Sequence, residues 1–404
     1  MPRRVVVTGL GLTSGLGGSR ERVTDCLLAG RTAFVMSPHL PFAVCPAEDD
    51  EDAASRRLGA WRFRRYLSRG GRLAVLAGLR AALDAGENAL DEETGMVGAA
   101  APTLDFSGEP GLPPGDPLRL DALWLLRWLP NTPVSALAAL LGLHGEGLTL
   151  GCACASGLAA LGEAWFRIRH GAMDSVLVAC GDSRLSPGGL LGYSKAHTLS
   201  RVQDPELAMR PFDRKHSGFV PGEGGAAFVV ESRERALTRG AVIRAEILGF
   251  GASLDGGSLT APDPKGVHAE KAVRRALDSA GIEPGAVDWV SAHGTGTAAN
   301  DEAEAALLRR VFGTGPSAPR VTALKSWLGH GSSAAGAMET AVCLMTAAAG
   351  FLPPVRGLEE PLSDLNFVRG IICDGRLTGS TGLLESFGFG GQNTALVLRL
   401  GELT

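Results

Sequence analysis

Residues 148–161 read Leu-Thr-Leu-Gly-Cys-Ala-Cys-Ala-Ser-Gly-Leu-Ala-Ala-Leu, and they contain the clearest indication of the fold class. An apolar segment meets a run of small residues at 151–157, and the apolar spacing that follows predicts a helix over 158–170. We call such a run of small residues between a strand and a helix an elbow. Small residues there let another backbone or a bound molecule approach closely. A strand that turns directly into a helix is typical of a layered α/β fold.

The same plan occurs a second time in the chain. His-Gly-Ser-Ser-Ala-Ala-Gly at 330–336 is a second small-residue elbow, and it leads into a helical run at 338–348. Each copy also opens with a strand that runs into Gly-x-Gly, at 5–11 and at 245–251. The repeat predicts two similar α/β halves that meet near residue 240, with two unrelated α/β halves as the alternative.

Composition excludes several classes of protein. Of 404 residues, 45% are hydrophobic and 20% charged, and the formal net charge is −4, which fits a globular protein without general affinity for nucleic acid. No apolar run approaches the ~18 residues that cross a bilayer, and the first residues lack the apolar region of a signal peptide, so we expect a cytoplasmic protein. The seven cysteines include no Cys-x-x-Cys pair, so neither a zinc site nor a disulfide scaffold is indicated.

Periodicity and breaker residues predict further elements. Strands are expected at 3–8, 175–180, 226–231, 242–250, 287–291 and 394–400, and helices at 73–85 and 267–280. Loops are expected at 46–58, which is acidic, and at 103–118, which is rich in Gly and Pro.

Cys154 is the first candidate for chemistry. It lies where the first elbow enters its helix, and the positive end of a helix dipole lowers the pKa of a thiol. A backbone N–H at such an elbow can also stabilise an oxyanion. The alternative is a buried thiol that acts as a small hydrophobe, and Cys152, on the strand side, fits that structural role.

Two histidines also follow apolar strands. His293 lies in Ala-His-Gly-Thr-Gly-Thr at 292–297, and His330 starts the second elbow. Lys325 lies in an apolar setting where an ammonium group needs a partner, and Glu339 can supply it. The alternatives are a turn histidine, a solvent-facing histidine and a structural Lys–Glu pair.

The segment Phe-Gly-Phe-Gly-Gly-Gln-Asn at 387–393 precedes the last strand. It lacks the Lys-Ser/Thr of a phosphate-binding loop and enters a strand instead of a helix. A backbone oxyanion donor beside an aromatic residue, Phe389, fits better. One Cys and two His at strand–loop–helix junctions together point to acyl transfer through a thioester.

The order of these motifs resembles the β-ketoacyl-acyl-carrier-protein synthases, the elongating condensing enzymes of fatty acid and type II polyketide pathways in the thiolase superfamily. The resemblance starts at Arg-Val-Val-Val-Thr-Gly-Leu-Gly (4–11) and ends at Gly-Phe-Gly-Gly-Gln-Asn (388–393). Between these lie Cys-Ala-Ser-Gly at 154–157, Arg-Pro-Phe-Asp at 210–213, Gly-Phe-Val at 218–220, Gly-Glu-Gly at 222–224, His-Gly-Thr-Gly-Thr at 293–297 and the segment 325–330.

The resemblance implies a thiolase fold, with two similar halves in a five-layer α-β-α-β-α core. Residues 1–240 would form the N-terminal thiolase-like half, which carries the nucleophilic Cys. Residues 241–404 would form the C-terminal half, which carries the two catalytic His and the Gly-rich gating loop. A dimer is also implied, either a homodimer or a heterodimer with a chain-length-factor-like subunit, in which the strand near 175–180 pairs across the interface.

The resemblance further implies decarboxylative Claisen condensation. Cys154 would take an acyl chain from the phosphopantetheine arm of acyl carrier protein. His293 and His330 would stabilise the enolate that forms when a malonyl-carrier thioester loses CO2. The resulting carbanion would attack the acyl-Cys and give a β-ketoacyl thioester.

The remaining roles are carried over in the same way. Lys325 would orient the histidine pair, and Glu339 would hold Lys325. Backbone N–H groups of Cys154 and Phe389 would form the oxyanion hole, and Phe389 also matches a gating aromatic. Thr295 and Thr297 match threonines that touch the pantetheine arm. No metal or tightly bound cofactor is implied.

The chain departs from the family pattern at Asn300, Ser332–Ser333, Gln392 and the segment Cys-Gly-Asp-Ser-Arg at 180–184. These changes leave the Cys-His-His set intact and are expected to reshape the acyl pocket or the tunnel for the arm. They favour a specialised biosynthetic enzyme.

A basic segment, 61–72, suggests where a carrier protein docks. Its five arginines are Arg62, Arg64, Arg65, Arg69 and Arg72, and it contains no acid. Carrier proteins are acidic, so opposite potentials would steer docking to this segment, which also helps dock the carrier in the family. The alternative is a solvated basic face.

Four other functions are considered from the sequence. A chain-length factor is a non-catalytic subunit of similar fold, but retention of Cys154, His293, His330 and Lys325 argues against it. The same residues fit the catalytic half of a ketosynthase/chain-length-factor heterodimer, or an acyltransferase. A thiolase is less favoured because thiolases need a second acid/base Cys and lack this histidine pair.

Overall fold

The computed structural model describes residues 2–48, 50–100, 122–371 and 377–401. The predicted loop at 103–118 lies outside the described residues. The strands are β1 (Val5–Thr13), β2 (Val35–Met36), β3 (Ala43–Val44), β4 (Gly95–Ala99), β5 (Gly147–Leu150), β6 (Ser175–Asp182), β7 (Gly224–Ser232), β8 (Ala245–Leu254), β9 (Trp289–Ser291), β10 (Arg320–Thr322), β11 (Thr381–Gly388) and β12 (Gln392–Leu400). The α-helices are α1 (Arg20–Leu28), α2 (Ala53–Ala60), α3 (Arg69–Ala85), α4 (Thr132–Leu141), α5 (Ser156–Arg169), α6 (Pro187–Lys195), α7 (Arg233–Thr238), α8 (Val267–Ala280), α9 (Ala298–Phe312), α10 (Lys325–Leu328) and α11 (Ala335–Ala348).

Ten of these strands form one continuous sheet, in the order β10-β9-β11-β12-β8-β1-β7-β6-β4-β5. The order repeats about its centre. On one side β1 is followed by β7, β6, β4 and β5, and on the other β8 is followed by β12, β11, β9 and β10. The first two pairings in each half are antiparallel and the last two are parallel. The predicted repeat of two similar halves is therefore confirmed in the strand topology.

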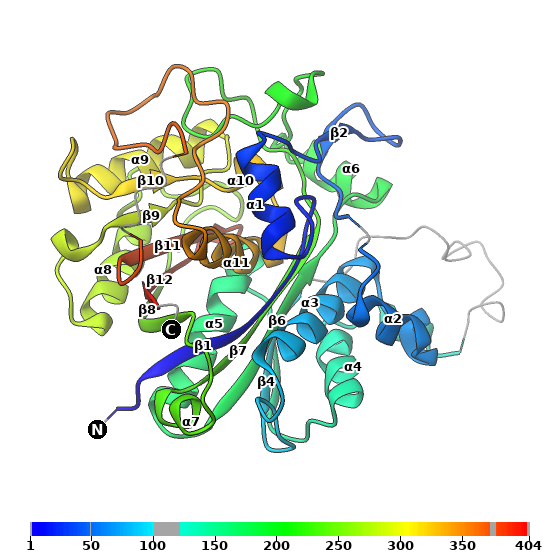
Figure 1. Cartoon of the computed structure of the whole chain (residues 1–404). Coiled ribbons are helices and arrows are strands. Elements are labelled where there is room, and N and C mark those ends of the chain that lie inside the picture. The colour runs from blue at the N-terminus through cyan, green and yellow to red at the C-terminus, as the bar shows by residue number, and fades with distance from the viewer. Residues whose placement is uncertain (1, 49, 101–121, 372–376, 402–404) are drawn as a thin grey trace.

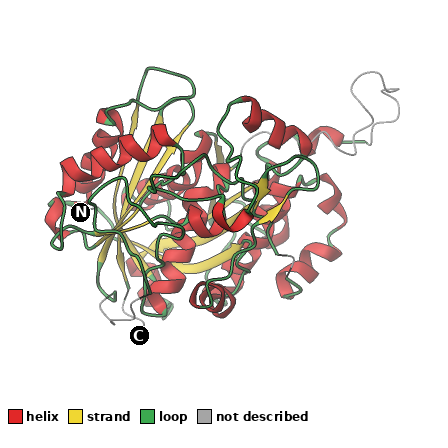
Figure 2. Ribbon diagram, turned by 90° about the horizontal axis from the view of Figure 1, so that it is seen from above, coloured by secondary structure: helices red, strands yellow, loops and turns green. Residues whose placement is uncertain are grey.

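The two halves join through β1 and β8, which pair antiparallel from Val5 opposite Ile247 to Val7 opposite Ala245. The sheet folds around two central helices, α5 and α11, which contact strands of both halves. Helix α3 packs on the outer face of β1, β7 and β6, and α8 packs on the outer face of β8 and β12 (Figure 1). Figure 2 shows from above that helices lie on both sides of the strands. These layers match the predicted five-layer core.

Helix α11 is covered on all sides along most of its length, whereas α5 exposes Phe166 near its C-terminal end. Every residue of α11 from Ala335 to Thr346 is buried. Gly157 of α5 permits the contact with α11, because a Cβ there would lie 2.7 Å from the backbone nitrogen of Ala337. The two predicted elbows therefore lie against each other.

Two predictions about single elements are wrong. Residues 46–58 are not all loop, because α2 begins at Ala53 inside them. Asp52 caps this helix: its carboxylate accepts the Ser55 N–H while the Ser55 side chain returns to the Asp52 backbone, a capping box that outweighs the acidic composition.

The strand near 175–180 cannot pair across a dimer interface as predicted. β6 is hydrogen-bonded to β7 on one side and to β4 on the other, so both of its edges are used. Among the described strands of this half, β5 pairs on one side only, with β4. A strand that is buried along its whole length lies inside the sheet, whereas β5 is partly exposed, and this difference identifies the edge.

Candidate active site

Cys154 occupies a single 3₁₀ turn, Ala153–Ala155, between β5 and α5. The residue before it, Ala153, has φ of 47°, which a residue with a side chain rarely adopts. The second elbow has the same feature, because Ser332 has φ of 51° at the matching position before Ser333. Strained backbone of this kind persists only where the surrounding structure holds it, and here it sets the direction of the Cys154 side chain.

The Cys154 thiol is buried, with 9% of the residue exposed. Burial raises the pKa of this thiol to about 11, and the charge of Lys325 and the backbone N–H of Phe389 lower it only partly. The predicted depression of the Cys154 pKa is therefore wrong. Helix α5 starts two residues later, at Ser156, and loss of solvent outweighs its dipole.

A thiol with this pKa gives a testable pH dependence. Because the thiolate is the nucleophile, we expect alkylation of Cys154 by iodoacetamide to rise about tenfold per pH unit from pH 7 to 9, without a plateau. Peptide mapping by mass spectrometry would follow this site separately from the other cysteines. A plateau below pH 8 would instead show a thiol activated by the helix.

His293 follows β9 and is held from two directions. Its own N–H and that of Gly294 donate to the Glu304 carboxylate, at 2.5 Å and 2.8 Å. Lys325 lies on the other side, with its Nζ 3.0 Å from His293 Nδ1 and 2.6 Å from the His293 carbonyl oxygen. Glu304 was missed by sequence reasoning, although an acid seven residues after the motif, about two helical turns on, was the available signal.

The predicted Lys325–Glu339 pair is present. Lys325 Nζ lies 2.6 Å from Glu339 Oε1, and both side chains are buried, at 0% and 3% exposure. Burial raises the pKa of Glu339 to about 7, and Lys325 acts in the opposite direction. An ammonium group that donates to Nδ1 of His293 leaves the proton of that neutral imidazole on Nε2.

His330 is oriented in a matching way. The backbone N–H of Ser332 donates to its Nδ1 at 3.2 Å, which also places the proton of the neutral ring on Nε2. The two imidazole rings lie 5.6 Å apart and nearly perpendicular. Burial and the Lys325 charge hold the pKa of both histidines well below the usual value, so both rings are neutral N–H donors at neutral pH.

These groups meet in one cavity of about 350 Å³. Of the predicted site residues, Cys154, His293, His330, Phe389, Thr295 and Thr297 line it, while Lys325 and Glu339 lie behind the histidines. Thr295 and Thr297 share a hydrogen bond of 2.8 Å between their hydroxyls. Gly388 lets the end of β11 approach the elbow, because a Cβ there would lie 3.0 Å from the Cys154 nitrogen.

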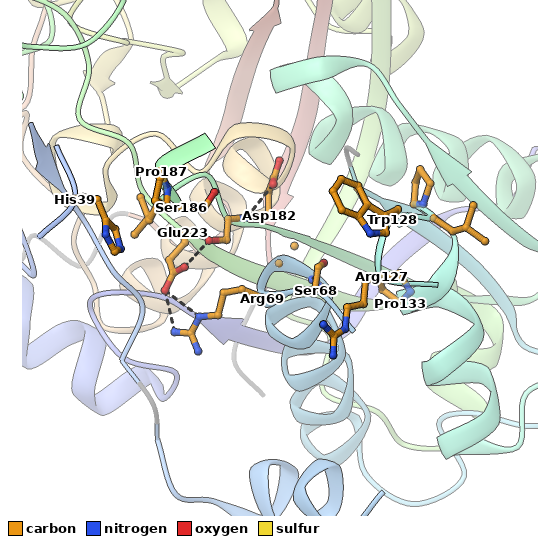
Figure 3. Close-up of a pocket in the computed structure, with 18 residues that line it drawn as sticks. His39, Ser68, Arg69, Arg127, Trp128, Pro133, Asp182, Ser186, Pro187 and Glu223 are labelled. Carbon is orange, nitrogen blue, oxygen red and sulfur yellow. Dashed lines mark hydrogen bonds and ion pairs between the residues drawn. The ribbon is translucent and has the colours of Figure 1, made fainter. Parts of the chain in front are cut away.

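The basic segment lies apart from this cavity. Four of its arginines are exposed: Arg62, Arg64, Arg65 and Arg72. Partial burial, and then repulsion from the nearby Arg127, Arg69 and Arg64, lower the pKa of Arg72. Arg69 differs from the others because its guanidinium binds the Glu223 carboxylate at 2.8 Å (Figure 3). Sequence reasoning missed Arg127, in the segment before α4. Together with Arg69 it lines a second pocket, separate from the Cys154 cavity.

No helix in the described ranges has the length and apolarity to cross a membrane. Within the same ranges, no group of three or more His, Cys, Asp or Glu is arranged to hold a metal ion.

Comparison with known proteins gives matches over both halves. Residues 2–236 match the β-ketoacyl synthase N-terminal domain, and residues 244–359 match the β-ketoacyl synthase C-terminal domain. A 3-oxoacyl-[acyl-carrier-protein] synthase 2 of Coxiella burnetii is 32% identical and is covered over 98% of each chain.

Solved structures agree with this result. The ishigamide ketosynthase/chain length factor superposes with a TM-score of 0.87 at 32% identity, over the whole of both chains. A type II polyketide ketosynthase solved with its acyl-carrier protein has a TM-score of 0.86 at 25% identity, again over the whole of both chains. The chain therefore belongs to the β-ketoacyl synthase family, transferases that move an acyl group and form a carbon–carbon bond.

Proposed function

We propose that this chain condenses a Cys154-bound acyl group with a malonyl thioester carried on acyl carrier protein, in a specialised type II polyketide or fatty-acid-like pathway. The observation that carries the proposal is the placement of two neutral imidazole donors beside a buried thiol in one cavity. Neutral N–H donors suit an oxygen that becomes negative during the reaction, because each can donate a hydrogen bond to that oxygen while it keeps its own proton.

In the first step, Cys154 Sγ bonds to the acyl carbonyl carbon and the bond from that carbon to the carrier sulfur breaks. The proton of the Cys154 thiol ends on the carrier thiol, so no charge is left in the cavity. The N–H of Phe389, which reaches Cys154, and the N–H of Cys154 itself would hold the oxyanion of the tetrahedral intermediate.

In the second step, the malonyl group loses CO2 and the electron pair of the broken bond forms an enolate. Its oxygen accepts hydrogen bonds from Nε2–H of His293 and His330, which Lys325 and the Ser332 N–H orient. The enolate carbon then attacks the Cys154 thioester and the C–S bond breaks. The Cys154 sulfur leaves as a thiolate and takes up one proton from water, and the β-ketoacyl thioester leaves on the carrier.

The roles of the two halves and of the two threonines are proposed from where these residues lie in the chain and around the cavity. Residues 1–240 would supply the nucleophile and residues 241–404 the histidines and the gating loop. Thr295 and Thr297, which line the cavity, would contact the pantetheine arm. The reaction would need no tightly bound cofactor, because the protein groups supply the hydrogen bonds and water supplies the one proton that each condensation consumes. The protein would work in the cytoplasm.

A dimer is part of the proposal, as a homodimer or with a chain-length-factor-like subunit. A relative solved as a ketosynthase/chain length factor supports the second arrangement, and strand β5, which pairs on one side only, offers an edge for a partner of either kind. The second candidate is an acyltransferase, or the catalytic half of a ketosynthase/chain-length-factor heterodimer with little activity alone. Both would form the same acyl thioester on Cys154.

The test uses purified chain with acyl-carrier and malonyl-carrier protein. Intact mass reports the acyl group on the chain, and released CO2 reports condensation. Both signals, with a β-ketoacyl product, support the proposal. Acylation without CO2 would favour acyl transfer or a missing subunit, and no acylation by any thioester would overturn it.

Docking of the carrier gives a separate prediction. Replacing Arg64 and Arg72 with Glu reverses two exposed charges of the basic segment, so we expect KM for the acyl-carrier protein to rise about tenfold. The rate with a small acyl thioester, which needs no docking, should change less than twofold. A matched double change of Arg274 and Arg309, which lie on α8 and α9, is the control. Equal KM values in all three proteins would exclude this segment as the docking surface.

A further inference from the structure

Strand β11 carries a buried acid, Glu385, that takes no part in the chemistry proposed for the Cys154 cavity. Glu385 is 0% exposed, and neither of its carboxyl oxygens receives a hydrogen bond from a donor in the described part of the chain. A carboxylate that is buried without a donor or a cation is far less stable than the neutral acid. Glu385 therefore favours its protonated form, and that proton needs an acceptor.

The acceptor is supplied by Glu304 of α9. Side chains alternate along a strand, so Glu385 and Leu383 lie on the same face of β11. Leu383 packs in one cluster with Leu307 and Leu308 of α9. Glu304 lies one helical turn before these leucines, on the same side of the helix, and is 1% exposed. The carboxyl groups of Glu304 and Glu385 interact there through a hydrogen bond between their side chains.

The two carboxyl groups differ in the donors that reach them. The Glu304 carboxylate accepts the N–H groups of His293 and Gly294, at 2.5 Å and 2.8 Å. It also accepts the side-chain amide of Asn300, at 2.9 Å. These donors stabilise a negative charge on Glu304. Burial and the charge of Glu304 hold the pKa of Glu385 well above the usual value, so the one proton of the pair stays on Glu385.

The other charged groups around the pair do not compensate a second negative charge. Burial, and further the charge of Asp301 on the same helix, raise the pKa of Glu304. On α11, Glu339 is already paired with Lys325 of α10, at 2.6 Å. The buried residues of α8 are all apolar. Two ionised carboxylates would therefore repel each other without a cation between them.

We propose that Glu385 is a carboxylic acid that keeps its proton at neutral pH and donates a hydrogen bond to Glu304. This bond fixes the carboxylate that holds the backbone of His293 and Gly294. Glu385 does not line the Cys154 cavity, so it is a positioning residue for His293. The positioning role rests on the proposed function, whereas the protonated state does not.

Infrared difference spectroscopy of the full chain at pH 8 tests the protonated state. A protonated carboxyl group has a carbonyl stretch that an ionised carboxylate lacks. Wild type minus Glu385→Gln should contain this band, and the band should shift in D2O. Glu283→Gln is the matched control, because an exposed carboxyl group is ionised at pH 8 and its difference spectrum should lack the band. Absence of the band from the Glu385 difference would overturn the proposal.

Two variants of similar size test the positioning role. Glu385→Gln keeps a donor, so CO2 release from malonyl-carrier protein should stay within about threefold of wild type. Glu385→Leu removes the donor, so CO2 release should fall at least about tenfold. Acylation of Cys154 should fall less than about threefold in Glu385→Leu, because backbone N–H groups serve that step.

Equal CO2 release by the two variants would overturn the positioning role, and so would equal losses of acylation and CO2 release in Glu385→Leu. If Glu385→Leu does not fold, Glu385→Gln alone decides, because a loss above about tenfold in a variant that keeps the donor contradicts the role. If wild type shows neither acylation nor CO2 release, the proposed function fails instead. The infrared band then still decides whether Glu385 is protonated.

Discussion

Cys154→Ala is expected to abolish both the acyl mass on the chain and the release of β-ketoacyl product, with a rate loss of about four orders of magnitude or more. The substitution removes the sulfur that forms the thioester, and no other described cysteine can replace it. Cys152 lies nearest in sequence, but it stands two residues earlier, where the chain leaves β5. Among the described cysteines, Cys154 is the one that lines the cavity with both histidines.

Cys152→Ala is the matched control, because it removes the same atom from a half-buried site outside the catalytic cavity. It should retain activity within about threefold and unfold at a similar temperature to Cys154→Ala. The measurement is intact mass after incubation with acyl-carrier protein. An acyl adduct on Cys154→Ala, or its loss in Cys152→Ala alone, would contradict the assignment of the nucleophile.

The second large effect is expected from the histidines, and it should separate the two half-reactions. His330→Ala removes one of two N–H donors to the enolate oxygen, so CO2 release should fall about 100- to 1,000-fold. Acylation of Cys154 should fall less than tenfold, because the donors reaching that oxyanion are backbone N–H groups. His293→Ala should behave alike, and it also leaves the buried Lys325 without one acceptor.

His170→Ala is the control, since His170 is exposed at the end of α5. Two assays check the prediction: acyl mass on the chain and CO2 released from malonyl-carrier protein. Equal losses in both assays would show that the histidine serves acylation, and undiminished CO2 release would remove it from the mechanism.

Sequence reasoning succeeded where a local pattern fixes a local shape. The helix predicted at 267–280 is α8 to the residue, because its apolar face is regular and Gly281 ends it in the left-handed region. The two elbows were visible because small residues are obligatory there. The same reasoning missed α2, because its start depends on one side-chain pair, Asp52 and Ser55, within an acidic stretch.

What depends on distant contacts could not be predicted. The pKa of Cys154 is set by burial between two halves that are far apart in the sequence. Glu304 and Asp182 act through backbone N–H groups on other elements, at 293–294 and 333. In the sequence, nothing distinguishes Arg69 from the other four arginines of its segment. In the structure its guanidinium donates a hydrogen bond to the carboxylate of Glu223, which is 154 positions away.

The matching elbows also assign a counterpart to the nucleophile. Ala153 and Ser332 share the same unusual backbone angle, so the residue that stands where Cys154 stands in the other half is Ser333. Its hydroxyl is already bound to Asp182 and is buried. If the two halves were identical, the positions of Cys154 and Ser333 would both carry a nucleophile, and the two would be related by the symmetry of the repeat. In this chain the backbone keeps the two-fold relation but the side chains do not. One elbow carries a thiol that lines the cavity, and the other carries a buried hydroxyl that is bound to Asp182.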